Sequence, residues 1–298
     1  MKVGAFQLQE PLPVLREPHV VSMVHPWVDA GNVGTLALTR LERYFNAEEI
    51  GKLERPGTFF DFTRYRPTTR WVEGKRTIEV PNTTISFAHR EESPDLIFIH
   101  VMEPHMAAED YITSLVELMK TLGIKRYTRL GGMWDAVPHT RPLLVTGMMN
   151  NKPLDVKGAQ GTRRSGQYEG PTTILGQLNT ELETLGIENA NLMVHLPQYL
   201  QLEEDFTGSA RLLEVLAHMY NLPSDLPETE HGRQQYSELN AEVERNPEAK
   251  RLVRRLEAHY DNRAANQEQR QQADNMPPLA PDIQKFLQDL GKKLDEPQ

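Results

Sequence analysis

The feature that most restricts the fold is a repeated order of apolar strand, glycine turn and amphipathic helix. The first instance starts with the apolar, β-branched run HVVSMVHPW at residues 19–27. The turn sequence DAGNVG follows at residues 29–34, and leucines at helical spacing then lead to Phe45. A second instance runs from a strand at residues 96–102 into a helix that Gly123 ends. This alternation predicts an α/β protein whose mostly parallel sheet is covered on both faces.

Three more apolar segments predict further strands, at residues 126–130, 142–148 and 191–196. Between the last two, a helix is expected over residues 171–185, where leucine and isoleucine recur on one face and Gly186 provides the stop. Loops at the carboxyl ends of parallel strands are the usual place for a ligand in such folds.

Residues 58–89 depart from this rhythm. Polar and apolar side chains alternate in TRWVE at residues 69–73 and in RTIEV at residues 76–80, and Gly74 lies between them. Two alternating runs around a glycine turn predict an antiparallel hairpin, which we expect to be added to the sheet.

The composition changes after Pro223, where large apolar residues become rare. The sequence therefore predicts an α/β core domain and a helical extension with a flexible linker, and the extension ends in an amphipathic helix that needs a surface to pack on, either its own body or a neighbouring subunit. The predicted segments are the core at 1–223, the extension at 224–298, its helices at 230–245 and 247–262, the linker near 263–280 and the amphipathic helix at 281–294.

Composition excludes several classes of function. The chain has no cysteine, which removes disulfides, thiolate nucleophiles and cysteine-ligated metal sites and favours a reducing compartment. It shows neither a signal peptide nor an apolar run long enough to span a bilayer, so we expect a cytoplasmic protein with no membrane partner. Its net charge of −9 argues against a nucleic-acid partner, since phosphate binding needs a basic face.

Four motifs in order resemble the proteasome assembly chaperone family of the second type (PAC2). They cover residues 18–223, about two thirds of the chain. The motifs are HPWVDAGNVG at 25–34, LGG at 130–132 with PHTRP at 138–142, YEGP at 168–171, and VHLPQY at 194–199.

The resemblance implies a three-layer αβα sandwich similar to that of nucleoside phosphorylases and hydrolases. It also implies self-association into a homo-oligomer, a trimer or larger, and a role in assembling other proteins. Eukaryotic and archaeal relatives help to build the proteasome core particle, and some dock on it through a C-terminal tail of a hydrophobic residue, tyrosine and any residue. This chain ends in LDEPQ, which does not match that tail.

The glycine loop of residues 29–34 has two interpretations. It lies where backbone N–H groups at a helix N-terminus suit a phosphate or carboxylate, although it matches neither GxGxxG nor the Walker sequence. Alternatively, its glycines form a tight turn and Asp29 or Asn32 caps the helix.

A second loop follows another predicted strand. Gly131 and Gly132 precede Asp135, His139 and Arg141, which together can orient an acid–base pair and clamp an anion. In the alternative, Arg141 pairs with Asp135, and His139 lies in solvent.

Two carboxylates complete the candidates. Glu103 follows a predicted strand, and Glu169 precedes a predicted helix. If the two side chains face one pocket, they can serve as an acid–base pair or as magnesium ligands. Otherwise they are negative charges at helix N-termini. His195, inside an apolar strand, reads as an interior histidine. The full set of ligand-binding candidates is Asp29, Gly31, Asn32, Gly34, Glu103, Gly131, Gly132, Asp135, His139, Arg141 and Glu169.

The sequence commits the chain to no reaction, and it assigns no catalytic residue, metal site or cofactor. We predict a homo-oligomeric binding or assembly protein. The alternative is an enzyme or sensor that binds a small phosphorylated or carboxylated metabolite at the carboxyl edge of the sheet.

Overall fold

The computed structural model describes residues 1–161, 170, 172–223, 225–226 and 229–274. The strands are β1 (Lys2–Val3), β2 (Phe6–Leu8), β3 (His19–His25), β4 (Glu48–Leu53), β5 (Thr68–Val72), β6 (Lys75–Glu79), β7 (Thr84–Ala88), β8 (Leu96–Met102), β9 (Arg126–Asp135), β10 (Val145–Met149), β11 (Lys152–Pro153), β12 (Gln160–Gly161) and β13 (Glu188–Pro197). The helices are η1 (Ala30–Asn32), α1 (Val33–Phe45), η2 (Pro56–Thr58), α2 (Ala108–Thr121), α3 (Ile174–Thr184), α4 (Phe206–Tyr220), α5 (Thr229–Arg245) and α6 (Pro247–Asp274).

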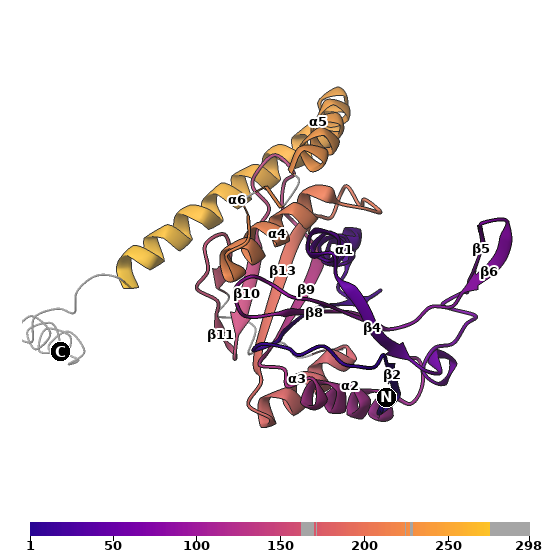
Figure 1. The fold of residues 1–298 in the computed structure, drawn as a ribbon. Helices are drawn as coiled ribbons and strands as arrows, with labels where there is room; N and C mark the ends of the chain where they lie inside the picture. Colours follow the sequence, from indigo (N-terminus) through magenta and orange to yellow (C-terminus); the bar gives the residue numbers. More distant parts are fainter. Residues whose placement is uncertain (162–169, 171, 224, 227–228, 275–298) are drawn as a thin grey trace, which may run out of the picture.

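One large mixed sheet forms the centre of the molecule, with the strand order β1-β2-β4-β7-β8-β3-β9-β13-β10-β11 and β12 paired to β10. Its middle strands β8, β3, β9 and β13 run parallel to one another. The flanking strands β7 and β10 pair antiparallel to this block. Helices α1 and α4 cover one face of the sheet and α2 and α3 cover the other, which makes three layers (Figure 1). The predicted α/β sandwich is therefore confirmed.

The two covered faces explain why the central strands are apolar without alternation. In β3, Val20 and Val24 contribute to the core under α2 and α3, whereas Val21 and Met23 contribute to the core under α1 and α4. A strand buried on both sides needs apolar side chains at consecutive positions. The same reasoning accounts for the apolar run in β8, where Ile97 and Ile99 face one core and Leu96 and Phe98 face the other.

Glycine stops end two of the helices as expected. Gly123 after α2 has φ of 65° and Gly186 after α3 has φ of 69°, and each donates its N–H to a carbonyl of the preceding turn. Only glycine takes this left-handed conformation without strain, so the helix ends are set locally.

The predicted hairpin is present, but it does not join the main sheet. β5 and β6 pair only with each other, and every residue of both strands is exposed. The strand β7, which follows the hairpin, instead takes the position between β4 and β8. The expectation that the hairpin extends the sheet is thus corrected, because a later segment occupies that place.

The C-terminal extension begins with α5, which packs on α4 and buries Tyr236 in the core under α1 and α4. The next helix, α6, continues to Asp274, into the stretch where we predicted the linker. Alanine, glutamine, glutamate and arginine dominate that stretch and are good helix formers despite their polarity. The predicted amphipathic helix at 281–294 lies outside the described residues, and the division at residue 223 stays a prediction.

Candidate functional site

The two glycine motifs pack directly against each other. The N–H of Gly132 donates to the carbonyl of Val28 at 2.7 Å, and Asp29 pairs with Gly132 as an isolated bridge beside β9. A Cβ on Gly132 would lie 2.5 Å from Cγ2 of Val33, and one on Gly131 would lie 2.7 Å from the Val28 carbonyl. These contacts are shorter than any side chain allows. The glycines therefore let the turn before α1 rest on β9; we call this contact the glycine joint.

Asp29 provides the N-terminal partner of α1. Its Oδ1 accepts the N–H of Gly34 at 2.6 Å and its Oδ2 accepts the hydroxyl of Thr35 at 2.7 Å. The carboxylate is buried, and this burial raises its pKa, while the hydrogen bonds oppose the shift. The capping interpretation of Asp29 fits this geometry, since the protein's own carboxylate occupies the donors that an anion would use.

Gly31 and Asn32 lie in the same turn with φ of 60° and 50°. Asn32 makes no side-chain cap, but the carbonyl of Gly31 accepts the N–H of Asp205 at 2.8 Å. Asp205 in turn caps α4 by accepting the Gly208 N–H at 2.8 Å, and the hydroxyl of Tyr236 donates to its other oxygen at 2.7 Å. Sequence reasoning missed Asp205, although an aspartate directly before a helical segment is a capping signal.

Glu103 supports a helix that is remote in sequence. Its Oε1 accepts the N–H of Ile174 at 3.0 Å, at the start of α3, rather than serving the helix α2 that follows it. Its Oε2 is buried and makes no hydrogen bond to a described residue. Burial raises the pKa of this carboxyl. Glu169, the predicted partner of Glu103, lies outside the described residues.

Asp135, His195 and Thr146 form a chain of hydrogen bonds across β9, β13 and β10. His195 Nδ1 donates to Asp135 Oδ2 at 2.8 Å, and its Nε2 lies 3.0 Å from the Thr146 hydroxyl. Because an ionised carboxylate only accepts, Nδ1 of His195 carries a proton. The His195 hydrogen bond holds the pKa of Asp135 below its usual range. His195 is thus a hydrogen-bonded interior histidine, as its apolar strand suggested.

Arg141 clamps α6 and does not pair with Asp135. Its guanidinium binds both carboxylate oxygens of Asp261, at 3.0 and 2.9 Å, and reaches Glu257 at 3.1 Å. Arg141 hydrogen bonds lower the pKa of Asp261. Tyr260 adds a hydrogen bond to the carbonyl of Pro142 at 2.7 Å. We call this set the α6 clamp; the predicted Arg141–Asp135 pair is wrong because a partner on a distant helix takes the guanidinium.

His139 is buried and does not lie in solvent, contrary to the alternative above. Its Nδ1 forms a hydrogen bond of 2.5 Å with the hydroxyl of Tyr199, and the same oxygen accepts the backbone N–H of His139 at 2.9 Å. Its ring also meets Tyr236 of α5 edge-on, with centroids 6.0 Å apart. Burial lowers the pKa of His139. This histidine therefore helps to seat the C-terminal helices on the core.

The described candidates line neither of two hollows on the described surface, one beside β4 and one at the start of α4. Within the described residues, no group of three or more histidine, aspartate or glutamate side chains is arranged to hold a metal ion. The described helices include none that is both long and apolar enough to cross a membrane. The carboxylates predicted for chemistry instead cap helices or bind a neighbouring side chain.

The hairpin presents the clearest surface for an interaction. We call residues 66–80 the arm; it projects from the body beyond β4 (Figure 1). Trp71 pairs with Arg76 and Thr69 pairs with Ile78, so the tryptophan and the isoleucine share one face. Trp71 is 73% exposed and Ile78 is 62% exposed. Side chains of this size are rarely left uncovered on one face of a ribbon.

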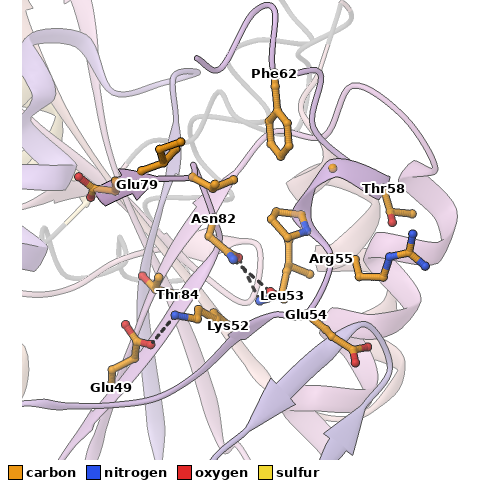
Figure 2. Close-up of a pocket in the computed structure, with 14 residues that line it drawn as sticks. Glu49, Lys52, Leu53, Glu54, Arg55, Thr58, Phe62, Glu79, Asn82 and Thr84 are labelled. Atoms are coloured by element: carbon orange, nitrogen blue, oxygen red, sulfur yellow. Dashed lines mark hydrogen bonds and ion pairs between the residues drawn. The ribbon is translucent and has the colours of Figure 1, made fainter. Parts of the chain in front are cut away.

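A groove of about 880 Å³ runs between the base of the arm and strands β4 and β7. We call it the arm groove. Leu53, Phe62, Ile78 and Val80 are among its lining residues. Figure 2 shows the Phe62 ring pointing into the space.

The rim of the arm groove is charged. Arg55, Glu54 and Glu79 lie around it with their charged ends turned away from the centre (Figure 2). At its floor, the side-chain amide of Asn82 exchanges two 3.0 Å hydrogen bonds with the backbone of Leu53. An apolar centre with a polar rim is the anatomy of a protein-binding surface. Sequence reasoning placed Ile78, Glu79 and Val80 in the hairpin but did not predict the groove, because its lining comes from separate segments of the chain.

Comparison with known proteins gives the chain a family. A model described as the PAC2 family matches residues 23–245. The chain belongs to the PAC2 family. No curated protein matches it in sequence. The match to the PAC2 model extends past the predicted core boundary and includes α5.

Solved structures share the fold. A protein of unknown function from Corynebacterium glutamicum has a TM-score of 0.77 and 21% identity, over 88% of this chain and 99% of that one. A PAC2 family protein from Streptomyces avermitilis has a TM-score of 0.66 and 25% identity, over 79% and 99%. A proteasome-assembly chaperone homologue from Mycobacterium tuberculosis has a TM-score of 0.65 and 23% identity, over 78% and 99%.

Proposed function

We propose that this PAC2 family protein is a homo-oligomeric binding and assembly protein that contacts other proteins through the arm and the arm groove. The observation that carries the proposal is the exposed apolar face of the arm, with Trp71 and Ile78 uncovered. No reaction is part of the proposal.

The energetics of a hairpin support this role. A two-stranded ribbon on its own is marginally stable in water, and it needs packing on one face to persist. Trp71 has 73% of its surface exposed, so a partner that covers it gains substantial apolar burial. Both ribbon edges also carry unpaired backbone groups, which suit a protein partner more than a small molecule.

A structural relative supports the class of partner. The Mycobacterium tuberculosis protein of similar fold is described as a proteasome-assembly chaperone homologue. An assembly role for the present chain accords with that description, and the client here is proposed to be another protein complex. The enzyme or sensor alternative has less support, since Asp29, Glu103 and Asp135 each accept a hydrogen bond within the fold.

Light scattering of the purified full chain over a range of concentrations tests the proposal. We expect a mass of three or more times the 34.1 kDa of one chain. The double variant Trp71→Ser, Ile78→Ser should lower that mass or reduce retention of partner proteins. Val14→Ser is the matched control, because Val14 is an exposed aliphatic residue, at 85%, outside the arm. A mass of 34.1 kDa at every concentration contradicts the proposal.

A further inference from the structure

We propose that the tip of the arm of one copy binds an acidic groove on a second copy of the chain. The receiving surface is a hollow of about 490 Å³ lined by Leu202, Glu203, Glu204, Phe206 and Gln235, which we call the acidic groove. This inference rests on the proposed function, and it names the partner of the arm.

The arm is basic in an acidic protein. Residues 66–80 contain four basic and two acidic side chains, a net charge of +2, whereas the whole chain carries −9, which leaves −11 on the remainder. Arg70 is neutralised by Glu79 at 2.5 Å. Lys75 and Arg76 form no ion pair with any described residue. The tip therefore presents two free cations beside Trp71 against the single carboxylate of Glu73 in the turn, so its net charge is positive and its electrostatic complement is an anionic surface.

The acidic groove supplies that complement. The side chains of Glu203 and Glu204 are exposed and form no ion pair within the described part of the chain. Leu202 and Phe206, which line the same groove, are partly buried. An apolar floor under two carboxylates matches an indole flanked by two cations, because the ring fills the hollow while each charge meets an opposite one.

The floor of the acidic groove is held in place before any partner binds. The ring of Phe206 stacks on His231 of α5, with centroids 4.0 Å apart and an interplanar angle of 16°. Gln235 accepts the Phe206 N–H at 3.2 Å and donates to the Glu204 carbonyl at 2.8 Å. A preformed hollow binds with less loss of side-chain entropy than a mobile one.

The position of the arm favours a second copy over its own groove. The arm extends outward beyond β4 (Figure 1), whereas α4 packs on β13 and β10, toward the other end of the strand order, and α5 packs on α4. Contact between an arm and a different surface on the next copy gives a two-fold pair when both copies exchange arms, and otherwise a closed ring or an open filament. The net charge of −11 on each body attracts the net charge of +2 on each arm, and this attraction orients two copies as they approach.

A charge exchange in the full chain tests the contact. Arg76→Glu alone and Glu204→Arg alone should each weaken self-association roughly tenfold, measured by sedimentation, because each places like charges together. The combined variant should restore association. Lys120→Glu is the control, since it makes the same charge change on α2, on the other face of the sheet.

Directed cross-linking gives an independent reading, because the chain has no cysteine of its own. A Lys75→Cys chain mixed with a Glu203→Cys chain should form a cross-linked pair with a short bis-maleimide. The same Lys75→Cys chain mixed with Lys120→Cys should not.

The outcomes separate the two proposals. A monomeric wild type overturns both. An oligomer that neither charge variant weakens overturns the arm contact and leaves the proposed function standing. Weakening by Arg76→Glu without rescue in the combined variant, or without the cross-link, shows that the arm binds elsewhere, and this also overturns the inference.

Discussion

Gly132→Ala distinguishes a packing joint from a ligand-binding loop. The added Cβ would lie 2.5 Å from Cγ2 of Val33, inside a core where Val33 is fully buried. If the glycine joint serves packing, the variant loses stability and nothing else. If the loop binds an anion, the variant loses affinity for phosphate or a carboxylate.

The magnitude follows from the geometry. A methyl group forced into a close-packed interior costs about 1–3 kcal/mol, and here part of the joint is backbone, which cannot rotate away. We therefore expect Gly132→Ala to lower the free energy of unfolding by about 2 kcal/mol, or the melting temperature by roughly 4–8 °C. Gly57→Ala is the control: its nearest contacts are ring atoms of Phe62 at 3.2 and 3.4 Å, so it should change stability by less than about 0.5 kcal/mol.

A double-mutant cycle in urea isolates the clash. Val33→Ala alone removes two buried methyl groups and should cost about 2 kcal/mol. In the Gly132→Ala background it relieves the contact, so the pair should be less destabilised than the sum by about 1 kcal/mol. If the two substitutions have additive effects on the free energy of unfolding, and Gly132→Ala alone leaves the urea midpoint unchanged, the packing role of the glycine joint is refuted. The ligand-binding interpretation of the loop would then be favoured.

Three further effects follow from the polar contacts. Arg141→Met should release the α6 clamp, so limited proteolysis within α6 should speed up several-fold while the melting of the core stays within about 2 °C; unchanged cleavage refutes the clamp. His195→Phe should cost about 1–3 kcal/mol in urea, since it leaves Asp135 and Thr146 without their partner. The pKa of Asp135 is lowered in the fold, so its contribution is complete above the unfolded pKa of about 4 and is lost as the pH falls through the folded value. The stability gap between wild type and Asp135→Asn should therefore narrow in acid, and a constant gap contradicts this assignment.

The parts of the fold that the sequence predicted are those whose causes are local. Strand β3 reads as a continuous apolar run because both of its faces are buried, and Gly123 and Gly186 end their helices through their own backbone conformation. The sequence predicted a strand end at residue 130 and a loop at Gly131 and Gly132, but β9 continues to Asp135, so both glycines lie inside the strand and Asp29 is bridged to Gly132 there.

The roles of the candidate residues depended on partners that are distant in sequence. Arg141 pairs with Glu257 and Asp261 on α6, and Glu103 caps α3 rather than the neighbouring helix. A periodic pattern reports which face of an element is apolar, and it contains no record of which distant charge approaches a given side chain. The carboxylates therefore looked available for chemistry, although the fold uses them to close helix ends and strand ends.

The hairpin is a case in which the local prediction is correct and the predicted packing is wrong: β5 and β6 pair with each other but do not join the main sheet. Polar and apolar side chains alternate on both sides of Gly74, and this pattern is typical of a two-stranded ribbon that buries its apolar face. The ribbon forms in register, yet Trp71 and Ile78 remain exposed. This uncovered apolar face is the observation behind the proposal that another molecule packs on the arm. The free cations Lys75 and Arg76 at the tip support the further proposal that the packing surface is anionic.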